Sequence, residues 1–152
     1  MISENDFLGR GWSFPPAFNR LTSPKGVAMT AGLTDIERSL HILLTTQPGE
    51  RIMLPDFGCD MQDIMFEPIS TALQARVKDR IETAILYYEP RIDPLDVTVE
   101  EPPEQPGLLL ITVTYRVRST NSRYNFVYPF YRNEGTDIPN PADVLGQSPL
   151  VR

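Results

Sequence analysis

A chain of 152 residues fits one domain with a single hydrophobic core. Its net charge of −6 argues against general binding to nucleic acid or to an anionic membrane, and no apolar stretch approaches the ~20 residues of a membrane span. The N-terminus lacks the order of a signal peptide, and the single cysteine excludes an internal disulfide. We therefore expect a protein of the cytoplasm that leaves it only inside a larger particle.

The first 26 residues combine glycine and proline with four aromatic side chains. This composition predicts an extended N-terminal arm whose aromatic residues need a surface on which to dock: Phe7, Trp12, Phe14 and Phe18. A short strand is expected over residues 27–30. The arm is followed by the main domain, residues 27–132.

Two helices with apolar stripes are expected in the main domain. Thr34 is predicted to begin the first through a capping box with Glu37, and its stripe is Ile36, Leu40, Leu43 and Leu44. Ser70 is predicted to cap the second, over residues 71–88, with the stripe Leu73, Val77, Ile81 and Ile85. Between them, Asp60 can cap a short helix through residue 66.

After Pro94 the apolar period changes from helical to two. The alternation predicts a strand with Leu95, Val97 and Val99 on its buried face and, after a proline-rich loop at residues 101–107, a longer strand up to Val117. A third strand follows a polar turn and carries an aromatic stripe: Tyr124, Phe126, Tyr128 and Phe130. Pro129 cannot donate to a ladder, so this strand is expected at a sheet edge.

These elements predict an α+β fold in which helices pack on one face of a small, mainly antiparallel β-sheet. The remaining segment, residues 133–152, is polar and has no convincing period. It is predicted to be an irregular C-terminal tail, disordered alone or ordered on a partner, with Val144 and Leu145 as its only apolar anchors.

The sequence offers few candidate catalytic residues. His41 and Cys59 could form a pair, but neither stands in a recognisable motif, so a core or surface role is favoured for both. Metal-ligand spacing and a phosphate loop are absent from the sequence. Glu67 with Asp56 or Asp60 could supply the two carboxyl groups of a glycosidase, although acidic residues beside turns are common.

The second helix ends abruptly at Glu89-Pro90-Arg91. An anion is mildly disfavoured there, because the last helical turn is the negative end of the macrodipole. One interpretation is a local ion pair of Glu89 with Arg91 beside an ordinary proline stop. The other is a docking point for another chain, since Pro90 stiffens the exit and directs both charged side chains.

Four motifs in order support a family resemblance. They are the segment 45–51 (Thr-Thr-Gln-Pro-Gly-Glu-Arg), the segment 54–59 (Leu-Pro-Asp-Phe-Gly-Cys), Phe66-Glu67-Pro68 and Glu89-Pro90-Arg91. Over residues 9–131 the chain resembles the baseplate wedge and sheath-initiator family of contractile injection systems. That family includes small lysozyme-like baseplate proteins of contractile phage tails and a type VI secretion subunit.

The resemblance implies a structural protein of the inner baseplate, without enzymatic activity, cofactor or metal, that joins the wedge to the tube and sheath. Its implied partners are the large wedge subunits, the sheath protein and tube or spike-hub proteins, and its implied location is the cytoplasm during assembly and the finished particle or virion afterwards. It assigns contact with the helical core bundle of the wedge to Glu89, Pro90 and Arg91. Alanine at Glu89 or Arg91 is expected to stop wedge assembly and leave the fold intact.

The resemblance also implies that sheath assembly starts by addition of strands from the first sheath subunits. The edge strand with Tyr124, Phe126, Tyr128 and Phe130 is the expected acceptor, because backbone bonds attach a strand while alternating side chains set its register. Two rivals remain: a peptidoglycan-degrading, lysozyme-like glycosidase, and a soluble adaptor unrelated to injection machines.

Overall fold

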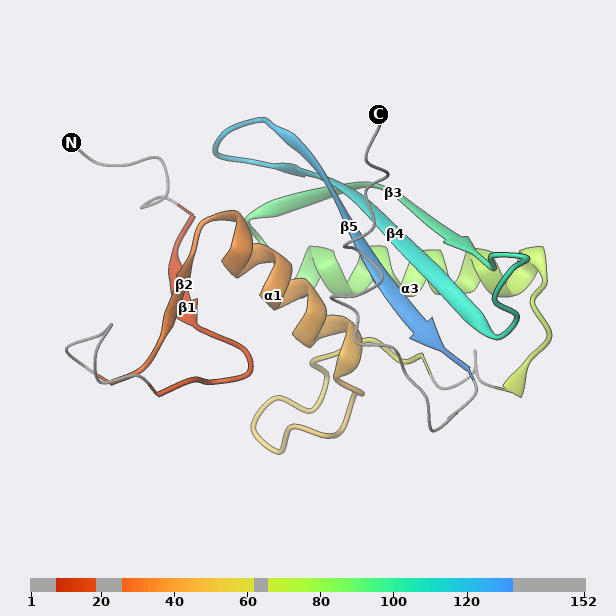
Figure 1. Ribbon diagram of the computed structural model, residues 1–152, viewed down its shortest axis with the longest axis horizontal. Helices are drawn as coiled ribbons and strands as arrows, with labels where there is room; N and C mark the ends of the chain where they lie inside the picture. The colour runs from red at the N-terminus through yellow and green to blue at the C-terminus, as the bar shows by residue number, and fades with distance from the viewer. Residues whose placement is uncertain (1–7, 19–25, 62–65, 133–152) are drawn as a thin grey trace, which may run out of the picture.

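The computed structural model describes residues 8–18, 26–61 and 66–132 (Figure 1). In chain order its elements are β1 (Arg10–Trp12), β2 (Met29–Ala31), α1 (Leu33–Thr45), α3 (Thr71–Tyr88), β3 (Ile92–Glu100), β4 (Leu108–Val117) and β5 (Arg123–Tyr131). The strands form two antiparallel sheets, β1-β2 and β3-β4-β5. Both helices lie on one face of the larger sheet. The α+β expectation is confirmed.

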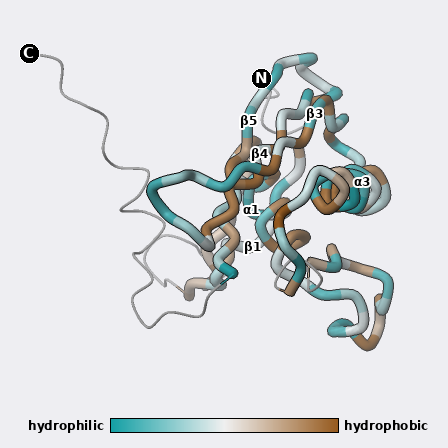
Figure 2. Tube along the Cα trace, turned by 90° about the vertical axis from the view of Figure 1, so that its right-hand side faces the viewer, coloured by the Kyte–Doolittle hydropathy of each residue, from teal (hydrophilic) through white to brown (hydrophobic). Residues whose placement is uncertain are grey.

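The core lies between that face and the helices. Five alternate residues of β4 are buried, as expected: Leu109, Ile111, Val113, Tyr115 and Val117. They meet the buried stripes of α1 and α3, which are those the sequence predicts, with Ala84 added to α3. The brown, hydrophobic trace of β4 runs through the middle of Figure 2, with α3 to one side of the sheet.

Helix α3 forms as the sequence predicts, with both bounds and its cap confirmed. The Ser70 hydroxyl accepts a hydrogen bond from the Leu73 amide at 3.2 Å, which satisfies one of the unpaired donors of the first turn.

The predicted capping box of α1 is wrong. The N-cap residue is Gly32, and no side chain caps this helix end. Gly32 has φ 65°, a backbone conformation that glycine adopts readily, and it turns the chain directly from β2 into the helix. Thr34 therefore falls inside the first helical turn, where its side chain cannot serve as a cap.

The first strand of the larger sheet also differs from the prediction. It begins at Ile92, before Pro94, and the pairing with β4 shifts between Pro94 and Asp96. Leu95 falls in this irregularity and is 41% exposed, so the expected buried position of Leu95 is wrong. Ile92, Val97 and Val99 supply the buried face instead.

Of the predicted N-terminal arm, the structure describes residues 8–18 and residue 26. Residues 10–12 pair with β2, which lies one to two residues later than the expected strand. Of the aromatic side chains, Phe14 contacts the His41 ring, with centroids 6.3 Å apart, while Trp12 and Phe18 stay largely exposed. Phe7, most of the expected helix at residues 60–66, and the tail at 133–152 lie outside the described residues. Among the described helices, none is long and apolar enough to cross a membrane.

Candidate docking sites

The exit of α3 is the first candidate site. Glu89 is the C-cap residue, and its amide donates to the Ile85 carbonyl at 2.9 Å. Its backbone then leaves helical geometry with φ −128° and ψ 76°, which turns its side chain into the protein. Glu89 is only 2% exposed, whereas Pro90 that follows it is exposed.

Arg91 holds the Glu89 carboxylate with two parallel hydrogen bonds. Arg91 Nε donates to Oε1 and Nη2 donates to Oε2, each at 2.6 Å. This bidentate geometry is the strongest pairing available to a guanidinium and a carboxylate. The hydrogen bonds to Glu89, followed by the one to Asp35, hold the pKa of Arg91 above its ordinary value.

The same guanidinium reaches two further segments. Its Nη1 donates to Asp35 Oδ2 in the first turn of α1 at 2.7 Å and to the Leu8 carbonyl of the N-terminal arm at 2.9 Å. Asp35 also accepts from the Thr30 hydroxyl of β2 at 2.8 Å. Arg91 therefore fastens the arm and the start of α1 to the exit of α3. We call Asp35, Glu89 and Arg91 the charge cluster.

The charge cluster depends on a glycine. A Cβ at Gly11 would lie 2.5 Å from Asp35 Oδ1, so only glycine lets β1 pass this close to the carboxylate. In the sequence Gly11 belongs to the expected extended arm, and no motif singles out Asp35. The one available signal for Asp35 was its place in the first turn of a helix, where an acidic side chain is favourable.

The structure therefore contains the local ion pair of Glu89 with Arg91, which was one of the two interpretations. Asp35 also takes part in it. Whether the exit also docks another chain stays a prediction. A partner could reach Pro90 and the neighbouring Leu86, which is 57% exposed, but the Glu89 carboxylate is covered.

The second candidate site is the outer edge of β5. The strand order β3-β4-β5 places β5 at an edge, as Pro129 indicated. The Val117 amide donates to the Ser122 carbonyl and the Arg132 amide donates to the Gly107 carbonyl, both at 2.9 Å. In an antiparallel ladder, residue pairs that exchange hydrogen bonds alternate with pairs that do not. Counting from Ser122 to Arg132, every second residue of β5 is therefore hydrogen-bonded to β4.

This alternation assigns the backbone groups of β5 to two sides. The four stripe residues, Tyr124, Phe126, Tyr128 and Phe130, bond to β4. Their side chains are half-buried against the core. The N–H and C=O groups of Asn125 and Val127 point to the open edge, as does the carbonyl of Pro129, which has no N–H to offer.

The opposite edge of the sheet is less open. The side chain of Gln74 on α3 donates to the Val99 carbonyl on the outer side of β3 at 3.1 Å. Along β5 the hydrogen bonds described for the backbone run to β4, and no side chain in the described part of the chain is seen bonding to its outer edge. Within the described part of the chain the two edges therefore differ: the outer side of β3 accepts a side-chain hydrogen bond, and that of β5 is described with none.

Three of the candidate catalytic residues contact other side chains of the domain. His41 contacts the rings of Phe14 and Tyr128, and burial followed by the Arg38 charge lowers its pKa. Glu67 is ion-paired with Arg76, and the Asp60 carboxylate lies 3.8 Å from Arg80 Nη1. In residues 8–18, 26–61 and 66–132, no group of three or more His, Cys, Asp or Glu side chains could hold a metal ion.

Cys59 is expected to react slowly with thiol reagents. It is 2% exposed, and burial raises the pKa of its thiol from 9.0 to about 11. At pH 8 the Cys59 thiol would then be ionised in roughly one folded molecule in a thousand, and in roughly one unfolded molecule in ten. Labelling should be at least ~50-fold slower in buffer than in denaturant; equal rates would contradict this. Because the pKa of Cys59 is higher in the folded than in the unfolded chain, its neutral thiol favours folding less as the pH rises. The contribution of Cys59 to stability is full below pH ~9 and is lost as pH rises toward 11.

Comparison with known proteins gives one consistent result. Residues 30–122 match the model of the family described as baseplate wedge protein gp25. The chain is 43% identical over 75 residues to baseplate wedge protein gp25 of Enterobacteria phage T4, a match that spans 49% of this chain and only 57% of the T4 protein.

Two solved structures are similar over longer stretches. A chain of the anti-feeding prophage baseplate is 32% identical, with a TM-score of 0.63, and the match covers 88% of this chain and 93% of that one. A tail-lysozyme candidate from Geobacter sulfurreducens is 45% identical, with a TM-score of 0.60 and coverages of 67% and 92%.

Proposed function

The chain belongs to the baseplate wedge protein gp25 family, and from this we propose that it is a structural component of the baseplate of a contractile injection system, where it links the wedge to the tube and sheath. The family match carries the proposal, because it runs from β2 through α1, α3 and the sheet to the turn before β5. In this proposal residues 27–132 form the baseplate domain, with an arm before it and a tail after it.

We assign contact with the helical core bundle of the large wedge subunits to the exit of α3. Glu89 is buried and acts indirectly, by holding Arg91 in place. The surface that a partner contacts is formed by Leu86, Pro90 and the outer side of Arg91. This division is supported by burial, since Glu89 is covered and Leu86 and Pro90 are exposed. Apolar contact around a partly buried charge is typical of an interface core.

We assign the start of sheath assembly to the outer edge of β5. A strand from a sheath subunit would bond to the outward groups of Asn125 and Val127. Because Pro129 has no N–H, the added strand cannot accept a hydrogen bond from β5 at that residue. The aromatic stripe of β5 packs against the core and holds the edge in place. The Gln74 contact on the far edge supports this choice of strand.

A second candidate function is cleavage of peptidoglycan, which the likeness to a tail-lysozyme candidate favours. Glu67 is the residue to test, since a glycosidase needs two carboxyl groups flanking the scissile bond. Its ion pair with Arg76 and half-exposed side chain are unlike the apolar site that keeps a general acid protonated. Wall turnover by the purified chain that disappears in Glu67→Gln would support the enzyme; no turnover by the parent would remove it.

Purification of the tagged chain from its native host tests the baseplate role. We expect mass spectrometry to recover sheath, tube and large wedge subunits with it, because a wedge component stays bound in the finished particle. An untagged lysate processed in parallel is the control. Recovery of the chain alone, under conditions in which particles form, would contradict the proposal. Assembly itself should take place in the cytoplasm, so partly assembled complexes are expected in the soluble fraction.

A further inference from the structure

The loop that follows α1 presents an unusual apolar surface. Ile52 and Met53 are 93% and 94% exposed, more than any other large apolar side chain in the described residues, and Leu54 beside them is 46% exposed. In Figure 1 this loop projects away from both helices and the sheet. We call these three residues the apolar knob.

The knob is held out by the structure of the loop itself. The Gly49 amide donates to the Pro55 carbonyl at 2.6 Å, which closes the base of the loop, and the Leu54 amide donates to the Arg51 carbonyl at 3.2 Å, which turns its tip. Burying a side chain the size of Met53 would stabilise the fold by roughly 1.5–3 kcal/mol, yet these turns keep it in solvent. A surface of this kind is expected to be covered by a partner.

The far end of the loop is anchored on α3. The Tyr88 hydroxyl donates to the Asp56 carbonyl at 2.7 Å, and the Phe57 ring packs against Tyr88 with centroids 5.1 Å apart. The Arg51 guanidinium lies 3.9 Å from the centre of the Phe57 ring. Loop and helix therefore present one fixed surface.

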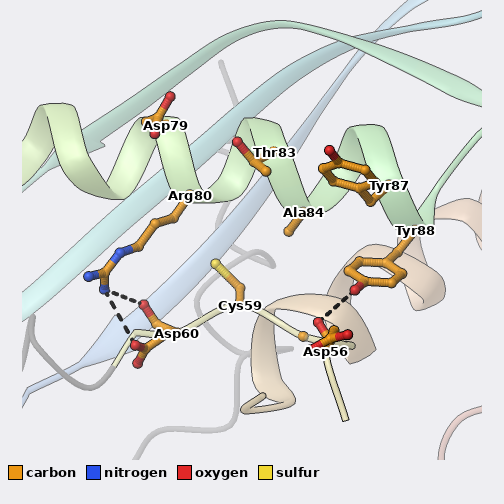
Figure 3. A pocket seen from close by; sticks show the side chains of 10 residues that line it. Asp56, Cys59, Asp60, Asp79, Arg80, Thr83, Ala84, Tyr87 and Tyr88 are labelled. Carbon is orange, nitrogen blue, oxygen red and sulfur yellow. Dashed lines mark hydrogen bonds and ion pairs between the residues drawn. The ribbon is translucent and has the colours of Figure 1, made fainter. Parts of the chain in front are cut away.

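A groove of about 290 Å³ lies where the loop meets α3 (Figure 3). Its charged lining consists of three carboxylates and one guanidinium: Asp56, Asp60, Asp79 and Arg80. Arg80 donates to the Asp60 carbonyl at 2.9 Å, so its charge is directed to that end of the groove. Asp79 and Asp56 leave the remainder acidic, and the exposed Tyr87 borders it.

We propose that the apolar knob and this groove together bind an amphipathic segment of another baseplate subunit, an inference that rests on the proposed function. Apolar side chains of that segment cover Ile52 and Met53, and a lysine or arginine enters the groove beside Asp79. The acidic groove supplies the charge complementarity that selects such a segment.

Two other occupants fit less well. A second copy carries the same net charge of −6, so its like charge would oppose the acidic groove. A membrane surface is disfavoured because the chain carries a net charge of −6 and the carboxylates beside the knob would face anionic headgroups.

Photo-crosslinking in assembled particles tests the proposal. A benzophenone amino acid replaces Met53, and in a second strain it replaces Leu95, an exposed apolar residue on β3. Substitution at Met53 should leave the melting temperature unchanged, since the side chain is exposed. We expect Met53 to give one product with a basic, amphipathic peptide of a different baseplate subunit, and Leu95 not to give that product.

A charge reversal in the groove gives the second readout. Asp79→Lys should lower the yield of the Met53 product at least ~5-fold, because the entering cation is repelled. Glu104→Lys, the same change in the exposed loop between β3 and β4, should leave the yield unchanged. These variants separate the groove from a general effect of net charge.

Several results would overturn the proposal: a Met53 product with a second copy of this chain, a product with lipid, no product from particles that contain the chain, or a yield insensitive to Asp79→Lys. Absence of the chain from purified particles is a separate result, because it contradicts the baseplate role itself and the knob proposal with it.

Discussion

Replacing Arg91 by methionine should lower the free energy of unfolding by about 3–5 kcal/mol, the usual cost of leaving a buried charge without its partner. Methionine keeps much of the volume of the arginine stem but none of its donors. The Glu89 carboxylate would then remain covered without either of its 2.6 Å bonds, and the Leu8 carbonyl and Asp35 would each lose a donor. Urea denaturation followed by circular dichroism measures the change.

Arg116→Met is the matched control. Arg116 pairs with Asp93 at 3.1 Å, but its side chain is 43% exposed, so water replaces the lost partner. We expect this variant to lose no more than about 1 kcal/mol. Similar unfolding midpoints for the parent and Arg91→Met would show that the charge cluster does not contribute as argued.

The expected loss of stability changes how docking at Glu89-Pro90-Arg91 should be tested. The sequence led us to expect that alanine at Glu89 or Arg91 would leave the fold intact. Because the charge cluster joins the arm, α1 and α3, a failure to assemble in those variants would not separate docking from folding. Pro90→Ala and Leu86→Glu alter the exposed side of the same exit and are the cleaner variants.

Replacing Val127 by proline should abolish sheath assembly on the baseplate while leaving the wedge assembled. The Val127 N–H points to the open edge, so its loss removes a donor for an incoming strand without removing a β4–β5 bond. Together with Pro129, the outer edge would then lack two successive outward donors. Electron microscopy of particles from the variant strain should show baseplates with tubes but no sheath.

Phe126→Pro provides the comparison one residue away. The Phe126 N–H belongs to the set that bonds to β4, so proline there breaks the sheet itself and should lower the stability of the domain by several kcal/mol. Val127→Pro should melt close to the parent. Normal sheaths in a folded Val127→Pro strain would exclude strand addition at this edge.

How far the sequence predicts this fold depends on how local each feature is. The cap and stripe of α3 and the alternation of β4 involve residues within a few positions of one another, and all were confirmed. Leu95 was misplaced because the irregularity around it is set by pairing with β4. Gly32 was missed because its positive φ is imposed by the turn between β2 and α1.

The candidate sites also differ in how local the residues that form them are. The open edge of β5 follows from one proline in an alternating segment. By contrast, Asp35 and Arg91 are 56 residues apart, and no local pattern joins them. The apolar knob lies between two of the motifs that support the family resemblance, with only Leu54 inside one of them, and its exposure is visible only once the loop is folded.

Pro129 also bears on the protein before it is assembled. An open strand edge is a risk for any subunit that waits in solution, because two copies can pair edge to edge and begin to aggregate. A second β5 laid against the first would meet a gap in its donors at each Pro129, since this residue faces outward. Free subunits are thereby hindered from pairing with themselves, while the segment before the proline remains competent for a different strand.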